Sequence, residues 1–151
     1  MIADFEEFCR NQPSVCSEKL VLTIIGNFIA LAPAERSERI SQLAQNCVTF
    51  FDHYRAPLDK KELARKQKKT LTRYQQEMLS RWGYPYLFKD FKFHLTLTGK
   101  ISKTAADELM PFLARKINPV LEDRFRIRQL VLARQEESGM FYQFLRRKLN
   151  Y

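Results

Sequence analysis

The sequence predicts an α+β fold in which antiparallel strands are covered by helices. The first observation is that two β-rich runs, 19–26 and 27–33, meet at Gly26 and Asn27. Because Gly and Asn tolerate positive φ, these runs are expected to form a hairpin. The second observation is a helical repeat of apolar residues over 35–54, which predicts a long amphipathic helix. Together they predict antiparallel sheet packed by helices.

Four further segments carry the pattern or the end signals of helices. They are 2–12, which Pro13 follows; a basic helix from Asp59 through about Lys68; 71–83, with Thr70 as cap and Gly83 as end; and a helix from Ser102 through about Ile117, which Pro111 kinks or divides. The runs RFRIRQLVLARQ (124–135) and MFYQFLRRKL (140–149) predict a second hairpin. With no internal repeat and no low-complexity linker, a single domain over 1–151 is expected.

Composition and charge limit the classes of function. The hydrophobic fraction of 45% is enough for a packed core. The sequence has no apolar run of about eighteen residues, so we expect no membrane span. The N-terminal sequence has no apolar stretch of the length that a secretory signal needs. Three cysteines in no CxxC pair are expected to be reduced thiols, so a cytoplasmic location is predicted. The formal net charge of +9 favours anionic partners.

The stretch 91–99, FKFHLTLTG, combines packing residues with a single imidazole. Side chains alternate between the two faces of a strand, so this stretch predicts one apolar face and one polar face. The apolar face carries Phe91, Phe93, Leu95 and Leu97, and the polar face carries Lys92, His94, Thr96 and Thr98. The polar face is either a solvated outer surface or the floor of a site.

A wider pattern surrounds this strand. It comprises GNFIALAP (26–33), FDHYRAPL (51–58), TRYQQEMLSRWGYPYLFKDFKFHLTLTG (72–99) and the closing strands. Together with FHLTLTG (93–99), these segments resemble the two-histidine phosphoesterase superfamily, in the branch associated with bacterial phosphonate metabolism. That superfamily includes RNA ligase-like cyclic phosphodiesterases, whose bilobal fold carries two His-x-Thr strands across one cleft. This chain resembles the later part of that fold and departs from the family in lacking the first motif, because Tyr and Arg follow its other histidine, His53.

The resemblance implies a site for a small phosphorylated substrate, with no metal and no cofactor. In such a site one histidine activates water or a hydroxyl and another protonates the leaving oxygen, since imidazole titrates near neutral pH. His94 fits one of these roles. The hydroxyl of Thr96, two residues along the same strand face, can donate to a phosphate oxygen. Proximity to the family elements adds Arg55, Tyr84 and Tyr86 as candidate substrate-binding residues.

Structural roles are alternatives for the same side chains. Arg55 can instead cap the carboxyl end of the preceding helix, and Tyr84 and Tyr86 can be core aromatics beside Trp82. His53 suits a helix carboxyl end, where its charge is favourable.

Three functions are compatible with these residues. The first is a cyclic phosphodiesterase-type hydrolase linked to phosphonate metabolism, in which a homodimer can bring two copies of His94 together. The second is a non-catalytic binding module or remnant with one His-x-Thr motif, a sequence that would also result if Met1 were an internal start. The third is RNA or other nucleic-acid binding through the basic run KKELARKQKK (60–69) with Arg146, Arg147 and Lys148. The sequence contains no Gly-rich phosphate loop, serine nucleophile elbow or zinc-ligand spacing.

Overall fold

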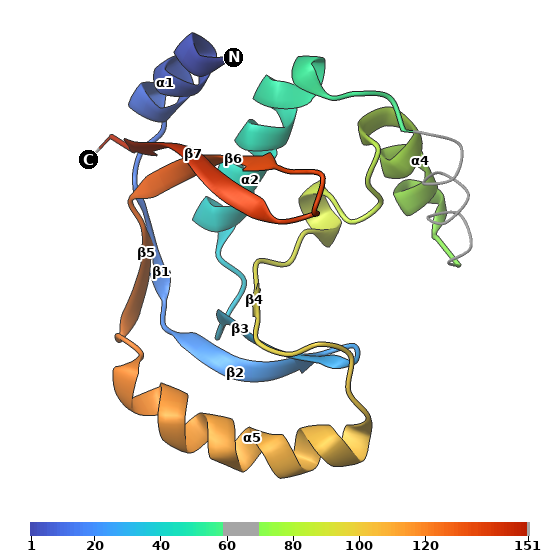
Figure 1. The fold of residues 1–151 in the computed structure, drawn as a ribbon, viewed down its shortest axis with the longest axis vertical. Helices are drawn as coiled ribbons and strands as arrows, with labels where there is room; N and C mark the ends of the chain where they lie inside the picture. Colours follow the sequence, from blue (N-terminus) through green and yellow to red (C-terminus); the bar gives the residue numbers. More distant parts are fainter. Residues whose placement is uncertain (59–69, 151) are drawn as a thin grey trace. The chain divides into compact units, whose positions relative to one another are not determined.

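The structure is a computed structural model that describes residues 1–58 and 70–150 (Figure 1). In chain order the described elements are α1 (Ile2–Asn11), β1 (Val15–Glu18), β2 (Leu20–Ile25), β3 (Phe28–Pro33), α2 (Glu38–Phe51), η1 (Asp52–Tyr54), α4 (Arg73–Trp82), η2 (Phe88–Asp90), β4 (Leu95–Thr96), α5 (Lys103–Ile117), η3 (Asn118–Val120), β5 (Arg124–Ile127), β6 (Gln129–Gln135) and β7 (Phe141–Lys148). The η elements are short 3-10 turns.

The described strands pair antiparallel in three groups, ordered β2-β3-β4, β1-β5 and β6-β7. This arrangement of antiparallel sheets and helices confirms the predicted α+β class. The predicted hairpin is present as β2 and β3, and Gly26 adopts φ +58° in the turn between them. The closing hairpin is present as β6 and β7, and its turn contains Gly139 at φ +83°.

The chain separates into two compact units. Unit 1 consists of Met1–Ile40 and the chain from Phe93 onward, and unit 2 consists of Ser41–Lys92. All the strands named above therefore belong to unit 1. The expectation of a single domain stays a prediction.

Helix α1 forms one part of the core of unit 1. It buries Phe5, Phe8 and Cys9 and packs against β6 and β7. Burial raises the pKa of the Cys9 thiol, and the nearby positive charge of Arg147 opposes that rise. The guanidinium of Arg147 also pairs with the carboxylate of Glu6, which ties β7 to α1.

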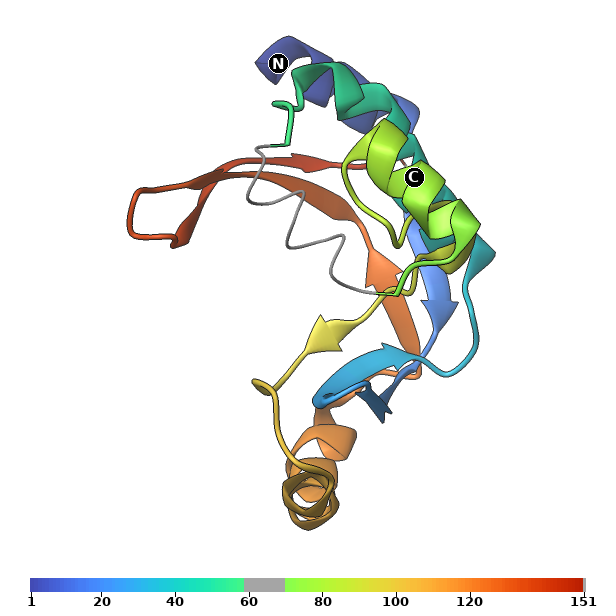
Figure 2. The ribbon, with the colours of Figure 1, turned by 90° about the vertical axis from the view of Figure 1, so that its right-hand side faces the viewer.

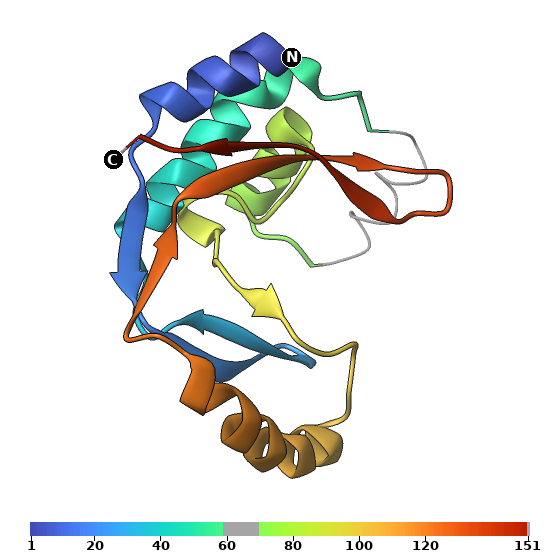
Figure 3. The ribbon, with the colours of Figure 1, turned by 60° about the vertical axis from the view of Figure 1, so that its left-hand side comes forward.

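The sheet β2-β3-β4 forms the other part of the core of unit 1. The side chains of Leu20, Ile29 and Leu31 lie on one face of this sheet by the observed register, and all three are buried. Helix α5 packs against β2 and β3 and buries Ala106 (Figure 3). This apolar face is therefore the core face of the sheet, and the opposite face buries only the small side chain of Ala30.

Unit 2 has a smaller core around α4. Met78 and Leu79 of this helix are buried, as is Leu87 after it. A capping box formed by Thr72 and Gln75 begins α4, so the predicted cap at Thr70 is wrong by two residues. The predicted end is confirmed, because Gly83 takes the left-handed conformation with φ +73°.

Other predictions are corrected by the strand pairing. RFRI (124–127) does not belong to the last hairpin, because it pairs as β5 with β1 over 15–18, a strand that the sequence analysis missed. The segment VCSE offers no long apolar alternation, so its pairing depends on the tertiary partner. Helix α5 is not divided at Pro111, and both Pro111 and Asp107, one turn earlier, lie on its exposed side. The predicted basic helix from Asp59 through Lys68 lies outside the described residues.

Among the described residues, no helix combines the length and the apolar character that crossing a membrane requires. Cys9, Cys16 and Cys47 form no disulfide with one another, in line with the expected reduced thiols.

Candidate functional site

The segment that contains His94, residues 93–98, is called the His94 segment here. It lies in unit 1, at the outer edge of β3. On one side of His94, the ring of Phe93 lies 5.3 Å from the ring of Phe125 on β5. On the other side, Leu95 and Thr96 pair with Leu31 and Ala30 of β3. The backbone is thus fixed on both sides of an exposed imidazole.

Thr96 follows two residues later and is also exposed. Alternation along an extended chain places the two side chains on the same side, about 6–7 Å apart. The register places Ala30 beside Thr96, and Thr23 of β2 beside Ala30. Directly paired residues share a face and strands lie about 4.8 Å apart, so Thr23 and Thr96 lie about 10 Å apart across the small Ala30.

Thr23 is a residue that the sequence analysis missed. It is the single polar side chain of β2, LVLTII, and this could have been read from the sequence as a signal. Only the strand register shows that it shares a face with Thr96.

Thr98, which the sequence placed on the polar face, bonds to the neighbouring strand. Its Oγ1 accepts a hydrogen bond of 3.0 Å from the backbone N–H of Ile29, and it is half-buried. Next to it, the N–H of Leu97 donates to the carbonyl of Ile29 at 2.9 Å. The Thr98 side chain thus takes the place of the next backbone carbonyl in the hydrogen-bond ladder between β3 and β4. This explains why the predicted strand 91–99 is reduced to Leu95–Thr96, and it leaves Thr98 with a structural role.

The predicted packing of Leu95 and Leu97 is also wrong. Their side chains are 42% and 38% exposed, although the register places them on the core face of the sheet. The physical reason is their place at the edge, because α5 packs against β2 and β3 further in. Phe91 and Phe93 are half-buried.

Arg55 lies in unit 2, where its guanidinium connects two segments. Its Nε donates to Oδ1 of Asp52 at 2.7 Å, and its Nη2 donates to the carbonyl of Arg81 at 3.2 Å. Arg81 is in the last turn of α4. Arg55 therefore does reach a helix carboxyl end, as one alternative had it, but the helix is α4 and not the preceding α2.

The backbone at Gly83 favours glycine, and the Arg55 side chain lies close to it. A Cβ at Gly83 would lie 3.0 Å from Nη1 of Arg55, and the backbone has φ +73°. Both the conformation and the close approach disfavour any larger residue. The elements HYRAP and RWGYP are thus held together through one guanidinium and one glycine.

The aromatic residues after α4 form contacts within unit 2. The rings of Tyr84 and Tyr86 meet edge to face at 5.8 Å, and Trp82 meets Phe88 in the same way at 5.4 Å. Tyr84 is exposed and Tyr86 is half-buried. In these ring contacts Trp82 pairs with Phe88 and with neither tyrosine. The guanidinium of Arg81 lies over the Trp82 ring, 5.0 Å from its centroid.

His53 lies in η1, with its ring 4.0 Å from that of Tyr54. It is the basic residue of the last turn of η1, a position consistent with the predicted role at a helix end. His94 and Thr96 are thus close together in unit 1, and Arg55, Tyr84 and Tyr86 are close together in unit 2.

The chemistry available to each group follows from this geometry. An exposed imidazole can take or give one proton, and the neighbouring hydroxyl can donate to an anionic oxygen. A single imidazole cannot act as base and acid in the same step. Within the described residues, no group of three or more His, Cys, Asp or Glu side chains is placed to hold a metal ion.

Comparison with known proteins identifies the family. Residues 1–143 match DUF1045, a family described as protein of unknown function. The chain belongs to this family. It is also similar to the ribose 1,5-bisphosphate phosphokinase PhnN of Janthinobacterium sp. (strain Marseille), with 35% identity over 109 residues. The matched region is 72% of this chain and 24% of that relative, so the chain spans about a quarter of the relative's length.

Proposed function

We propose that this DUF1045 chain is a two-histidine phosphoesterase-like protein that acts on or binds a small cyclic phosphate or phosphodiester. The observation that carries the proposal is the placement of His94 and Thr96. Both are exposed in a short segment whose backbone is bonded to β3. A fixed backbone with two outward polar groups favours a phosphoryl-binding role over a packing role.

In this proposal the two side chains have separate tasks. The His94 imidazole exchanges a proton with water or with a bridging oxygen of the ester. The Thr96 hydroxyl donates to a non-bridging oxygen and offsets its charge. Thr23 lies on the same face and is a further hydroxyl within reach of a ligand larger than one phosphate.

Arg55, Tyr84 and Tyr86 are proposed as substrate-binding residues on the resemblance alone. Arg55 already donates to Asp52 and to the carbonyl of Arg81, so we propose that it acts chiefly by holding the Tyr84–Tyr86 segment in place. Tyr84 is the more exposed of the two tyrosines and the better candidate for direct contact with a ligand.

The proposed setting is phosphonate metabolism, with a phosphorylated sugar as the substrate class. The resemblance of RWGYPY and FHLTLTG supports the setting, and the name of the relative, which specifies ribose 1,5-bisphosphate, supports the substrate class. Kinase chemistry has no support in this sequence. A phosphate loop needs two glycines five positions apart, and Gly26, Gly83, Gly99 and Gly139 provide no such pair.

A second proton-transfer group is needed for hydrolysis, and we propose His94 of a second copy as its source. A homodimer would then be the active form, and a strict monomer with full turnover in light scattering and assay would contradict that version. A non-catalytic phosphate-ester-binding protein is the second candidate function, because only one His-x-Thr motif is present. A cytoplasmic location stays a prediction.

The test is hydrolysis of 2′,3′-cyclic nucleotides and smaller cyclic sugar phosphates by the chain and by His94→Ala. Turnover that falls at least about 100-fold in His94→Ala and in Thr96→Val is the expected result. The matched controls are His53→Ala and Thr98→Ser, which are expected to keep turnover within about threefold because neither is assigned to the site. Equal turnover by the chain and His94→Ala would overturn the proposal. Binding of the cyclic phosphates that depends on His94, without turnover, would select the non-catalytic candidate.

A further inference from the structure

The closing strands are strongly basic. Between Arg124 and Lys148 there are seven basic and two acidic side chains, a formal excess of five out of a net +9 for the whole chain. Neither acidic residue, Glu136 or Glu137, lies in β5 or in the strand parts of β6 and β7. The charge of the strands themselves is therefore uniformly positive.

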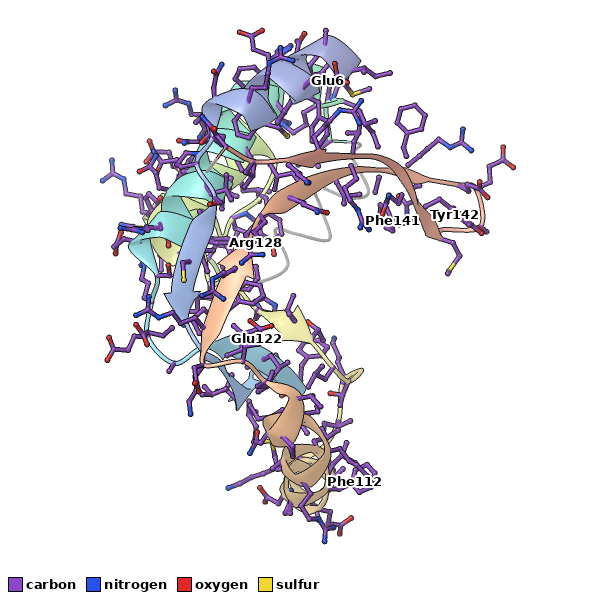
Figure 4. The ribbon with its side chains drawn as sticks, turned by 90° about the vertical axis from the view of Figure 1, so that its left-hand side faces the viewer. Glu6, Phe112, Glu122, Arg128, Phe141 and Tyr142 are labelled. Atoms are coloured by element: carbon purple, nitrogen blue, oxygen red, sulfur yellow. The ribbon has the colours of Figure 1, made fainter. Side chains whose placement is uncertain are left out.

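Three of these basic residues form a row on one face of β5. Phe125 and Ile127 are half-buried on one side of the strand, and alternation places Arg124, Arg126 and Arg128 on the other, where all three are exposed. Successive members lie about 6.6–6.8 Å apart along an extended strand. A groove of about 650 Å³ is lined by Glu122 and by every residue of 124–129. Glu122 and Arg128, near the two ends of this stretch, are labelled in Figure 4.

The row is only partly neutralised. Arg126 has an ion pair with Glu122 at 3.6 Å. Arg124 and Arg128 make no ion pair with any of the described residues, and the same holds for Lys148, which pairs with Gln129 beside the row. Like charges this close together repel one another unless an anion lies between them. An extended anion, longer than a single phosphate, would match three guanidinium groups in line.

Beyond the row, the same stretch of chain carries exposed aromatic side chains. β5 runs directly into β6, and β6 and β7 extend from it as a two-stranded arm (Figures 2 and 3). Near the tip of this arm, Phe141, Tyr142 and Phe144 are 66%, 52% and 56% exposed. Figure 4 shows Phe141 and Tyr142 on the arm, and Arg128 at its base. Stacking of bases on aromatic rings, with cationic side chains along the phosphates, is the common mode of binding single strands.

We propose that the arginine row and the aromatic arm form a binding surface for single-stranded nucleic acid. Arg124, Arg126 and Arg128 contact successive phosphates, and Phe141 and Tyr142 stack on bases further along the strand. This surface differs from the basic run considered in the sequence analysis, whose residues 60–69 lie outside the described part of the chain. It also does not rest on the proposed chemistry of His94, because none of its residues belongs to that segment.

The test is the binding of a fluorescein-labelled single-stranded RNA of about 12 nucleotides, followed by anisotropy over a range of salt concentrations. The first variant is the triple substitution Arg124→Gln, Arg126→Gln and Arg128→Gln. Its matched control is Arg10→Gln, Arg39→Gln and Arg115→Gln, which removes three exposed charges of unit 1 from α1, α2 and α5. The net charge of the two variants is the same, so only the position of the charges differs.

The row variant is expected to bind at least 10-fold more weakly and to lower the slope of log K against log salt by about 2, since each lost phosphate contact of a single strand removes about 0.7. The control is expected to change affinity less than threefold. If the triple variant does not fold, Arg128→Gln alone is expected to lower the slope by about 0.7. If the row variant and the control variant weaken RNA binding equally, the proposal is overturned, because binding would then depend on net charge alone.

The arm is tested with Tyr142→Ala and with inorganic polyphosphate as a competitor without bases. Tyr142→Ala is expected to weaken RNA binding about 5- to 100-fold and to leave polyphosphate binding unchanged. Polyphosphate or an acidic peptide that binds as tightly as RNA would overturn the choice of ligand. His94→Ala is expected to bind RNA as the unchanged chain does, so failure here and failure of the hydrolase proposal are separate results.

Discussion

Two candidate residues, His94 in unit 1 and Arg55 in unit 2, are held in position in opposite ways. At His94, the backbone on either side is held by strand pairing and by a ring contact, and the side chain is exposed. At Arg55, the side chain itself does the holding, through Asp52 and the carbonyl of Arg81. A polar residue whose hydrogen-bonding groups complete the fold is a weaker candidate for ligand contact than an exposed polar residue on a fixed backbone.

The same contrast exists within one motif. Thr96 and Thr98 have the same side chain and are two residues apart, yet only Thr98 accepts a hydrogen bond from β3 in the described contacts. Alternation predicts equal roles for both, and the strand ladder decides between them.

Gly83→Ala is expected to give the largest loss of stability. The substitution requires a left-handed alanine and places its Cβ 3.0 Å from the Arg55 guanidinium, so we expect a loss of about 2–4 kcal/mol in free energy of unfolding. Urea denaturation measures it. Gly139→Ala has positive φ but open space and is expected to cost about 1 kcal/mol. If Gly83→Ala costs no more than Gly139→Ala, the close approach to Arg55 has no energetic role.

Thr98→Val is expected to lose about 1–2 kcal/mol, because the N–H of Ile29 loses its acceptor at a half-buried position. The matched change Thr96→Val is expected to alter stability by less than about 0.5 kcal/mol and to affect phosphate-ester binding instead. Denaturation of the two variants side by side makes the comparison. Similar losses for both would show that the two threonines do not divide into a structural and a functional residue.

Arg55→Lys is expected to cost about 1 kcal/mol. A lysine cannot bridge Asp52 and the carbonyl of Arg81 together, and the partly exposed ion pair itself contributes little in water. If Arg55 holds the loop, Tyr84 fluorescence quenching by iodide should rise in Arg55→Lys. Unchanged stability and quenching, with lost ligand binding, would instead make Arg55 a direct ligand contact.

The smallest expected effect concerns Cys9, a fully buried group that contrasts with exposed His94. Burial raises the pKa of the Cys9 thiol, with Arg147 opposing. The folded state therefore holds this proton more tightly than the unfolded state. The resulting stability is fully present below the ordinary thiol pKa and is lost as pH rises from there through the raised pKa of the folded state. Cys9→Ala is expected to flatten the fall in stability above about pH 8.5. An unchanged slope would contradict a buried neutral thiol.

Local signals allowed much of the fold to be predicted. Gly26 in the hairpin turn, Ser102 at the start of α5 and Gly83 at the end of α4 each fix a local geometry, and all three are confirmed. Strand β1 and the separation of β5 from β6 could not be predicted, because they depend on a pairing between residues more than 100 positions apart. For the site, the sequence leaves open whether the polar face that carries His94 is a solvated surface or the floor of a site. The different roles of Thr96 and Thr98 required the register with β3.

The central claim is that His94 and Thr96 contact a phosphoryl group, and the chain offers a direct test because it has only two histidines. We would follow the ring resonances of His53 and His94 by NMR across pH, with and without a nucleoside 2′-phosphate, the product-like ligand. A bound phosphate is expected to shift the ring resonances of His94 and to leave those of His53 in place, and Thr96→Val should reduce the shift. Ring resonances that do not shift, or that shift equally for both histidines, would contradict the proposed site.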